Sequence, residues 1–224
     1  MNLSGPYALT PGHWAASWLI GNARRWSHEG NRATTRDRGA DNSSVDMLGA
    51  LGEVLAYTRL RDDPVAGPFM RRNMVVKRED VSGCSPDFVV WPAIGVDAKV
   101  SSCVQRNRYF AINEKKHAAL SGGAWYMCVL TKPLASRAYA QMVRREAVCA
   151  WPCFDLGGYG DPSRNIEMSE FCETYAPRCS IGHLRGAPEF SWDRVRDVIP
   201  SVFGRMSDVL PTEYSPLAAV PDRL

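Results

Sequence analysis

The chain has 224 residues, of which 45% are hydrophobic, and a formal net charge of +3. This length and apolar content suffice for one globular domain with elaborations and a full core. No apolar run reaches the roughly 18 residues of a membrane span, and the N-terminus lacks the continuous apolar core of a signal peptide. The composition therefore argues against a membrane or secreted protein and predicts a cytoplasmic one.

Residues 13–26 predict a helix, because Trp14, Trp18 and Trp26 recur on one side of it. Aromatic side chains at this spacing are more often part of a core than a platform for stacking on bases, and we interpret them as core. The polar residues 27–42 predict an exposed loop, either simply solvated or ordered by a polyanion.

Residues 43 to about 60 predict a second helix with a stripe of leucines, and Ser43 is its candidate N-cap. Glu53 lies off that stripe among small residues, so the helix backbone can pack close to a sheet there. This placement aims a carboxylate at a neighbouring strand. The alternative is an ordinary exposed glutamate paired with Arg59.

Two short apolar runs at 88–91 and 96–100 predict consecutive strands of a hairpin, separated by the breaker stretch 92–95. Asp97 and Lys99 are two residues apart on the second strand, so their side chains point to the same face. Burying that face without a ligand would cost several kcal/mol per charge. The pattern therefore predicts a cation, a substrate or open solvent at this place.

Pro86-Asp87, a gap, and Asp97-Ala98-Lys99, with Glu53 in the helix upstream, resemble the signature of the PD-(D/E)XK nuclease superfamily. The resemblance covers roughly residues 43 to 131. It implies an α/β fold with a restriction endonuclease-like core, a central mixed sheet flanked by helices. The expected organisation is an N-terminal helix and basic loop at 1–42, the nuclease core at 43–150, a C-terminal elaboration of the same domain at 151–206 and a tail at 207–224.

The resemblance also implies a chemistry, namely divalent-metal-dependent hydrolysis of phosphodiester bonds in DNA, with an endonuclease favoured. Asp87, Asp97 and the backbone carbonyl of Ala98 would ligate Mg²⁺, for which Mn²⁺ could substitute. Glu53 would hold a second metal or a metal-bound water. Lys99 would position the attacking water and offset charge in the transition state. The expected catalytic set is thus Glu53, Asp87, Asp97 and Lys99.

The remaining chain predicts elements that complete such a domain. Asn113 is a candidate N-cap of a short helix over 114–120, with Lys115 and Lys116 in its first turn. The other expectations are a first strand at 73–78, an apolar entry at 109–112, a strand at 125–130, a strand or short helix at 139–148, irregular structure at 163–190, a helix near 192–206 that Pro200 kinks or restarts, and a loose tail.

The basic residues are 22 arginines and 5 lysines. Arginine matches phosphate bidentately, although a GC-rich genome would give the same bias. Several basic residues flank the predicted site, and Arg106, Arg108, Lys115 and Lys116 are the expected nucleic-acid contacts. DNA is the favoured partner on the resemblance, RNA stays open, and a homodimer is expected because enzymes of this kind often cut two strands.

Three alternatives accompany this interpretation. The seven cysteines form no CxxC pair, which indicates buried thiols, although Cys149, Cys153, Cys172, Cys179 and His183 could form a zinc site. A protein of the same fold could bind nucleic acid without cutting it. The motif could also be accidental, with Asp97 and Lys99 forming an exposed ion pair on a half-solvated sheet.

Overall fold

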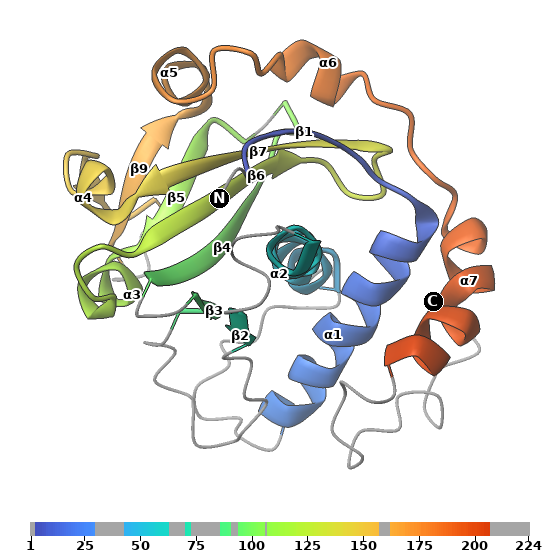
Figure 1. Ribbon diagram of the computed structural model, residues 1–224. Helices are drawn as coiled ribbons and strands as arrows, with labels where there is room; N and C mark the ends of the chain where they lie inside the picture. The colour runs from blue at the N-terminus through green and yellow to red at the C-terminus, as the bar shows by residue number, and fades with distance from the viewer. Residues whose placement is uncertain are drawn as a thin grey trace.

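The computed structural model describes residues 3–29, 43–62, 70–72, 86–90, 94–105, 107–156 and 162–206, with side chains for all of these except 23–29, 43–46, 70–72 and 206. These residues form an α/β fold in which helices lie on both faces of a mixed sheet (Figure 1). The predicted fold class is confirmed at this level.

The main sheet has six strands in the order β1-β7-β6-β4-β3-β2. Its strands are β1 (Gly5–Ala8), β2 (Met70–Arg72), β3 (Phe88–Val90), β4 (Ile94–Ser102), β6 (Trp125–Thr131) and β7 (Arg137–Arg144). Only β4 and β6 pair in parallel, and all other neighbours are antiparallel. A parallel pair needs a crossover, which β5 and α3 supply here.

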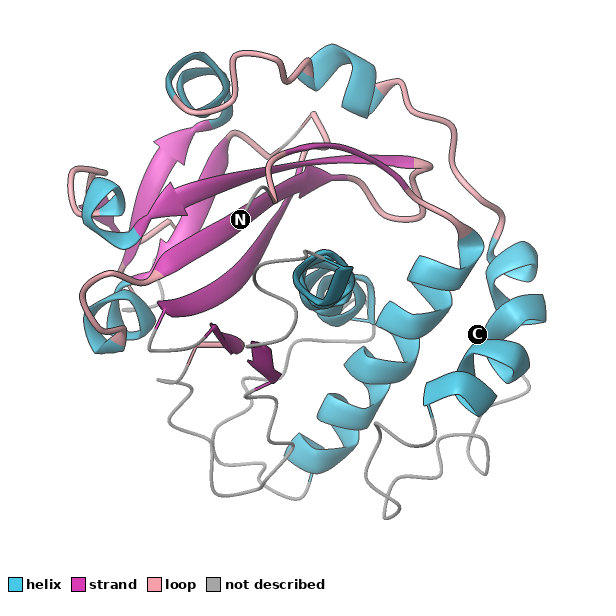
Figure 2. Ribbon diagram, in the orientation of Figure 1, coloured by secondary structure: helices cyan, strands magenta, loops and turns pink. Residues whose placement is uncertain are grey.

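A second sheet of three strands has the order β5-β9-β8, formed by β5 (Tyr109–Asn113), β8 (Cys153–Phe154) and β9 (Ser163–Glu167). Figure 2 shows its strands beside the main sheet, at the end that carries α3 and α4. The short helices around it are α3 (Glu114–Ala119), α4 (Arg145–Val148), α5 (Met168–Thr174) and α6 (Ile181–Arg185). Phe110 of β5 and Phe171 of α5 stack on each other, with ring centroids 5.3 Å apart.

Three longer helices lie on the opposite side of the main sheet, namely α1 (Pro11–Glu29), α2 (Ser43–Asp62) and α7 (Trp192–Met206); α2 packs on the strands, α1 on α2, and α7 on α1 (Figure 1). The core is therefore divided in two by the sheet. Val96, Ala98, Met127 and Val129 belong to the helix side, whereas Tyr126, Cys128 and Leu130 belong to the other side. This division follows the period of two along β4 and β6.

The tryptophans of α1 belong to the core, as predicted. Trp14 is fully buried, and its Nε1 donates a hydrogen bond of 2.9 Å to the carbonyl of Ala135. Trp18 is also buried and contacts the ring of Trp192 on α7. Pro200 lies inside α7 without ending it, because it sits on the exposed side while Val195, Ile199 and Val202 face the core.

Several expectations about the elements need correction. The region 163–190 is not irregular, since it contains β9, α5 and α6, and the apolar entry at 109–112 is the strand β5. The stretch 92–95 does not separate the hairpin strands as a whole, because Ile94 and Gly95 already belong to β4. Residues 27–29 continue α1.

Other expectations concern residues outside the described ranges. These are the loop at 30–42, the strand at 73–78 and the tail at 207–224; the strand that pairs with β3 is formed by Met70–Arg72. The alternatives for 139–148 are both present, as the end of β7 and as α4. The predicted strand at 125–130 and the helices of residues 13–26, 43–60, 114–120 and 192–206 are confirmed within a few residues.

Candidate functional site

The antiparallel hairpin of β3 and β4 brings the two predicted aspartates together. Its register pairs Phe88 with Val96 and Val90 with Ile94. One step beyond the paired residues, the same register sets Asp87 opposite Asp97. Side chains opposite each other on antiparallel strands lie on the same face, about 5 Å apart at Cβ, and like charges in such a pair repel. The pair therefore needs a nearby positive charge.

Lys99 supplies one positive charge. Its Nζ forms an ion pair with Asp97 Oδ2, which confirms that the two side chains share a face. The pair is not on the surface, because Asp97 is 6% exposed and the Lys99 side chain is 21% exposed. The alternative of an exposed ion pair on a solvated sheet is therefore wrong.

Pro86 and Asp87 shape the end of β3. The backbone N–H of Ala98 donates a hydrogen bond of 2.8 Å to Asp87 Oδ2. The Asp87 side chain thus accepts the hydrogen bond that a backbone carbonyl would accept if the strand pairing continued. In the continued register the residue opposite Ala98 is Pro86, which has no N–H to donate. The N–H and C=O of one strand residue point to the same side. The carbonyl of Ala98 thus faces Asp87 without a ladder donor from Pro86.

The helix α2 reaches this place through a close approach to β4. A Cβ built on Gly52 would lie 2.6 Å from Val100 Cγ2 and 3.4 Å from the Cβ of Ala98, so only glycine lets the helix lie this near. Glu53 is the next residue and is 6% exposed. The predicted packing of small residues around Glu53 against a sheet is confirmed, and the alternative of an exposed glutamate is wrong.

The electrostatics show that all four predicted catalytic residues influence one another. Burial, followed by the charges of Glu53 and Asp97, raises the pKa of Asp87 to about 7. Burial by itself would lower the pKa of Lys99, but the charges of Asp97, Asp87 and Glu53 outweigh it and the pKa is raised. All three carboxylates thus act electrostatically on the one lysine of the described site.

The donor chemistry of the site fits a hard divalent cation. Apart from its ion pair with Lys99, the buried Asp97 Oδ2 accepts no hydrogen bond from a described residue. The surrounding donors are oxygens of Asp87, Glu53 and the Ala98 carbonyl, which Mg²⁺ and Mn²⁺ prefer. No three His, Cys, Asp or Glu side chains of the described ranges converge closely enough to hold a metal as they stand. Closing a ligand set would require the carboxylates to draw together.

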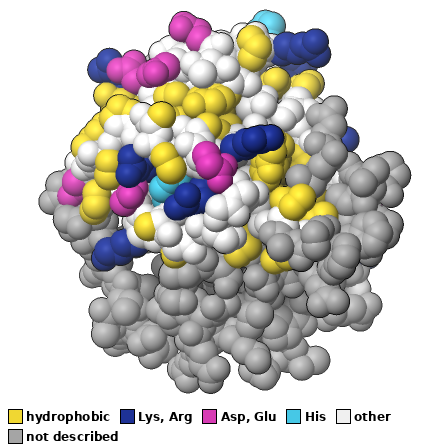
Figure 3. All heavy atoms as spheres, turned by 60° about the vertical axis from the view of Figure 1, so that its left-hand side comes forward, with side chains coloured by type: hydrophobic (Ala, Val, Ile, Leu, Met, Phe, Trp, Pro, Cys, Tyr) yellow, Lys and Arg dark blue, Asp and Glu magenta, His cyan; other side chains and the backbone are white. Residues whose placement is uncertain are grey.

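The residues predicted to contact nucleic acid differ in their surroundings. Arg106 lies outside the described residues, and Arg108 is exposed but pairs with Glu167 over 2.6 Å. Lys115 and Lys116 are exposed in the first turn of α3, where the predicted N-cap Asn113 accepts a hydrogen bond from the Lys116 N–H. Figure 3 shows basic and acidic side chains interspersed on the face it presents. No single-sign surface therefore stands out in that view.

The structure adds a second polar cluster that the sequence did not reveal. Tyr126 lies next to Asp97 in the parallel register of β4 and β6. Its hydroxyl is 3.0 Å from His117 Nδ1, and His117 Nε2 is 3.4 Å from Cys149 Sγ. Only the strand register and the position of α3 bring these residues together, so no local sequence pattern marks them.

The predicted alternative of a zinc site is not assembled. Cys149 lies beside His117, whereas Cys172 and Cys179 form a separate pair in which a hydrogen bond from Cys179 lowers the pKa of Cys172. Within the part of the chain that the structure describes, no three potential ligands come together.

Comparisons with known proteins assign no family to the chain. Neither a scan against protein-family models nor a search of curated proteins found a match. No helix of the described ranges is long and apolar enough to cross a membrane.

Proposed function

We propose that this protein is a divalent-metal-dependent nuclease that hydrolyses phosphodiester bonds in DNA, acting as an endonuclease. The observation that carries the proposal is the largely buried cluster of three carboxylates and one lysine at the end of β3. Burial, followed by the charges of Glu53 and Asp97, raises the pKa of Asp87 to about 7. Proteins tolerate such an arrangement where a cation or a reaction uses it.

Asp87, Asp97 and the Ala98 carbonyl would hold Mg²⁺ or Mn²⁺, with Glu53 completing the set or holding a second ion. When bound, the cation would polarise the phosphate and make a bound water more acidic. The protein's part is to fix these oxygens: Ala98 N–H holds Asp87 at 2.8 Å, and the close packing of Gly52 holds Glu53 against β4.

Lys99 has a role of its own. Its raised pKa keeps the ammonium group charged at neutral pH, and Asp97 holds it in place. A fixed cation in a site largely closed to solvent stabilises negative charge that builds up on phosphorus during attack by water. Its three N–H donors can also orient that water.

The finer fold assignment and the partners belong to the same proposal. The order of α2, β2, β3, β4, β5, α3 and β6 supports our assignment of a restriction endonuclease-like core, and the resemblance to PD-(D/E)XK nucleases supports DNA over RNA. We also expect a homodimer, since cutting both strands of a duplex needs two sites.

The test is cleavage of labelled single-stranded DNA, duplex DNA, branched DNA and RNA with Mg²⁺, Mn²⁺ or EDTA. Asp97→Ala and Lys99→Ala are compared with the wild type, and circular dichroism checks that each variant is folded. We expect cleavage that EDTA and both substitutions abolish. Binding of DNA without cation-dependent cleavage in any metal would instead favour a catalytically inactive binding protein, and equal activity in all three proteins would mean a contaminant.

A further inference from the structure

A cavity of about 410 Å³ lies between the three long helices, and none of the carboxylates of the candidate site lines it. Residues of α1, α2 and α7 line it, together with Thr10 before α1. This volume falls within the range of about 300–1,000 Å³ that is typical of small-molecule sites. The function proposed above makes no use of it.

The charged side chains among the described lining residues of the cavity are two arginines. Arg61 of α2 and Arg205 of α7 both line it, and none of its described lining residues is acidic. The Nε–H of Arg61 donates a hydrogen bond of 2.8 Å to Asp62, and the Nε–H of Arg205 donates to the Ser201 carbonyl. Each guanidinium has five N–H donors, so both retain donors for an anion.

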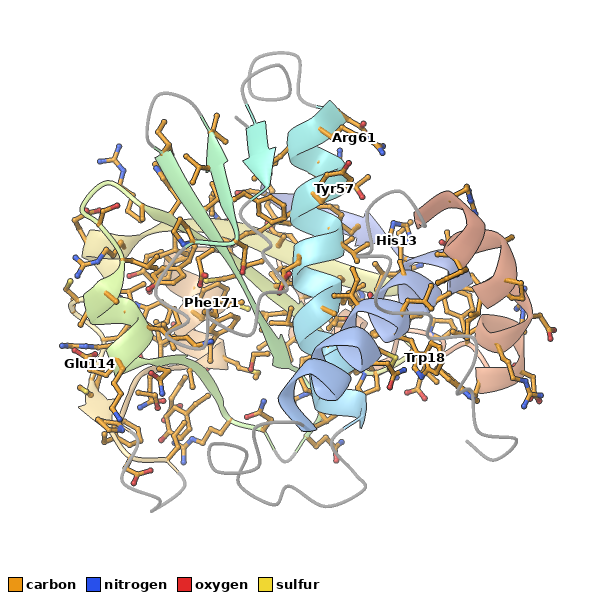
Figure 4. All side chains as sticks on the ribbon, turned by 90° about the horizontal axis from the view of Figure 1, so that it is seen from below. His13, Trp18, Tyr57, Arg61, Glu114 and Phe171 are labelled. Atoms are coloured by element: carbon orange, nitrogen blue, oxygen red, sulfur yellow. The ribbon has the colours of Figure 1, made fainter. Side chains whose placement is uncertain are left out.

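The walls between the two arginines suit a flat, partly polar ring. Ile20, Val54 and Val202 provide apolar surface, and Tyr57 provides an aromatic ring over which Arg61 lies at 5.7 Å. Figure 4 shows Tyr57 and Arg61 on α2 and His13 on the neighbouring helix α1. Bases bind to proteins by stacking on such rings in a positively charged groove.

His13 adds a defined hydrogen-bond donor. The backbone N–H of Thr10 donates to His13 Nδ1 over 3.2 Å, and burial lowers the pKa of His13. The ring is therefore neutral at pH 7, with Nδ1 as the acceptor and the proton on Nε2. The Thr10 hydroxyl, 2.8 Å from Nδ1, is engaged with the same ring, so the Nε2–H is the donor that would suit the polar edge of a base.

The cavity is also close to the candidate site along α2. Tyr57 follows Glu53 by one helical turn, a rise of about 6 Å. The Tyr57 ring also contacts the tilted ring of Phe88, with centroids 6.5 Å apart, and Phe88 follows Asp87. Tyr57 thus connects the cavity with the two elements that carry Glu53 and Asp87.

We infer that this cavity binds one nucleotide, with the base between Tyr57 and the apolar walls and the phosphate at Arg61 and Arg205. The nucleotide is either a unit of the cleaved strand or a free mononucleotide. The first source rests on the proposed function, and the second does not.

The experiment is isothermal titration calorimetry in EDTA with 5′-dAMP, 5′-dTMP, deoxyadenosine and inorganic phosphate. We expect both mononucleotides to bind more tightly than deoxyadenosine or phosphate. Arg205→Ala and Arg61→Ala should each weaken binding roughly tenfold, as expected for loss of a charge-assisted contact. Arg196→Ala is the matched control, because Arg196 is exposed on α7 and pairs with Asp193 outside the cavity.

Binding of neither mononucleotide, binding of phosphate alone with equal affinity, or unchanged affinity in both cavity variants would each overturn the inference. The source of the nucleotide follows from cleavage of a short oligonucleotide. A KM raised about tenfold by Arg205→Ala indicates a unit of the strand, and an unchanged KM with lost mononucleotide binding indicates a free nucleotide. Asp97→Asn should lose cleavage and keep mononucleotide binding, so the two proposals fail separately.

Discussion

Two buried polar clusters lie side by side on neighbouring strands, and they differ in how their polar groups are satisfied. On β4, Asp97 forms an ion pair with Lys99, and the charges of Asp87 and Glu53 also act on that lysine. On β6, Tyr126 is hydrogen-bonded to His117, which lies within reach of Cys149. The second cluster is neutral, because burial raises the pKa of Tyr126 and lowers that of His117.

The difference separates a structural cluster from a candidate site. Polar groups that satisfy one another inside a protein hold the surrounding elements in one arrangement, here α3 against β6. Buried charges that do not balance cost stability and are retained where function uses them. Each prediction below changes one of the two clusters or the helix that carries Glu53.

The largest expected effect is on catalysis. Asp97→Asn removes a charge from the first cluster and should lower the rate of Mg²⁺-dependent DNA cleavage by about 10³-fold or more. Tyr126→Phe changes the adjacent residue of the second cluster and should alter that rate by no more than about threefold. Single-turnover rates on a labelled duplex measure both. An equal loss in the two variants would contradict the division between the clusters.

The second prediction concerns the stability of the metal-free protein. The pKa of Asp87 is raised from 3.8 to about 7, so the folded protein binds this proton more tightly than the unfolded chain does. The stability that protonated Asp87 contributes is complete below pH 4 and is lost as pH rises towards 7 and above. At about 1.4 kcal/mol for each pKa unit, the loss is a few kcal/mol.

Asp87→Asn should therefore gain stability relative to the wild type as pH rises from 4 to 7. Urea unfolding in EDTA at several pH values measures the difference. Asp193→Asn is the control, since the Asp193 side chain is 75% exposed on α7. A difference between Asp87→Asn and the wild type that does not change with pH would refute the raised pKa of Asp87.

The parts of the first cluster that follow from local pattern were predictable from the sequence. The alternation along β4 set Asp97 and Lys99 on one face, and the small residues around Glu53 indicated close helix packing. Both statements need only the geometry of one strand or one helix. The cap at Asn113 and the buried tryptophans of α1 are local in the same sense.

The parts that depend on pairing between distant segments were not predictable. β1 joins the sheet through pairs such as Gly5 with Ala140, and its four residues show no alternation that would mark a strand. β9 reads Ser-Arg-Asn-Ile-Glu, a polar stretch whose pairing with β5 decides its conformation. The second cluster likewise exists only because of the register between Asp97 and Tyr126.

A third prediction tests the approach of α2, on which the first cluster depends. Gly52→Ala forces its Cβ to within 2.6 Å of Val100 Cγ2, and the valine side chain has few other rotamers. Overpacking of this kind costs about 1–3 kcal/mol, partly offset by the better helix propensity of alanine, about 1 kcal/mol. Cleavage should fall as well, because the displaced helix carries Glu53.

Gly49→Ala on the same helix is the matched control, since nothing lies within 4 Å of its added Cβ. It should stabilise the protein by about 1 kcal/mol and leave cleavage unchanged. The double variant Gly52→Ala/Val100→Ala should recover part of the stability and the cleavage rate that Gly52→Ala loses. Thermal unfolding measures the stability of each variant, and a single-turnover assay measures its cleavage rate. Full activity in Gly52→Ala would show that cleavage does not need the close packing of α2 on β4.

The smallest effect belongs to the second cluster and has the opposite pH dependence. Burial, followed by the charge of Arg145, lowers the pKa of His117, so below pH 6.5 the unfolded chain binds more protons than the folded one. The stability that neutral His117 contributes is present above pH 6.5 and is lost as pH falls.

At pH 7, His117→Gln should cost about 1 kcal/mol for the hydrogen bond to Tyr126. Towards pH 5 the difference in free energy of unfolding between variant and wild type should narrow, because the wild type loses stability and glutamine does not titrate. Urea unfolding at several pH values measures this difference. A difference that widens in acid would mean that His117 is charged in the folded protein and that the second cluster is not neutral.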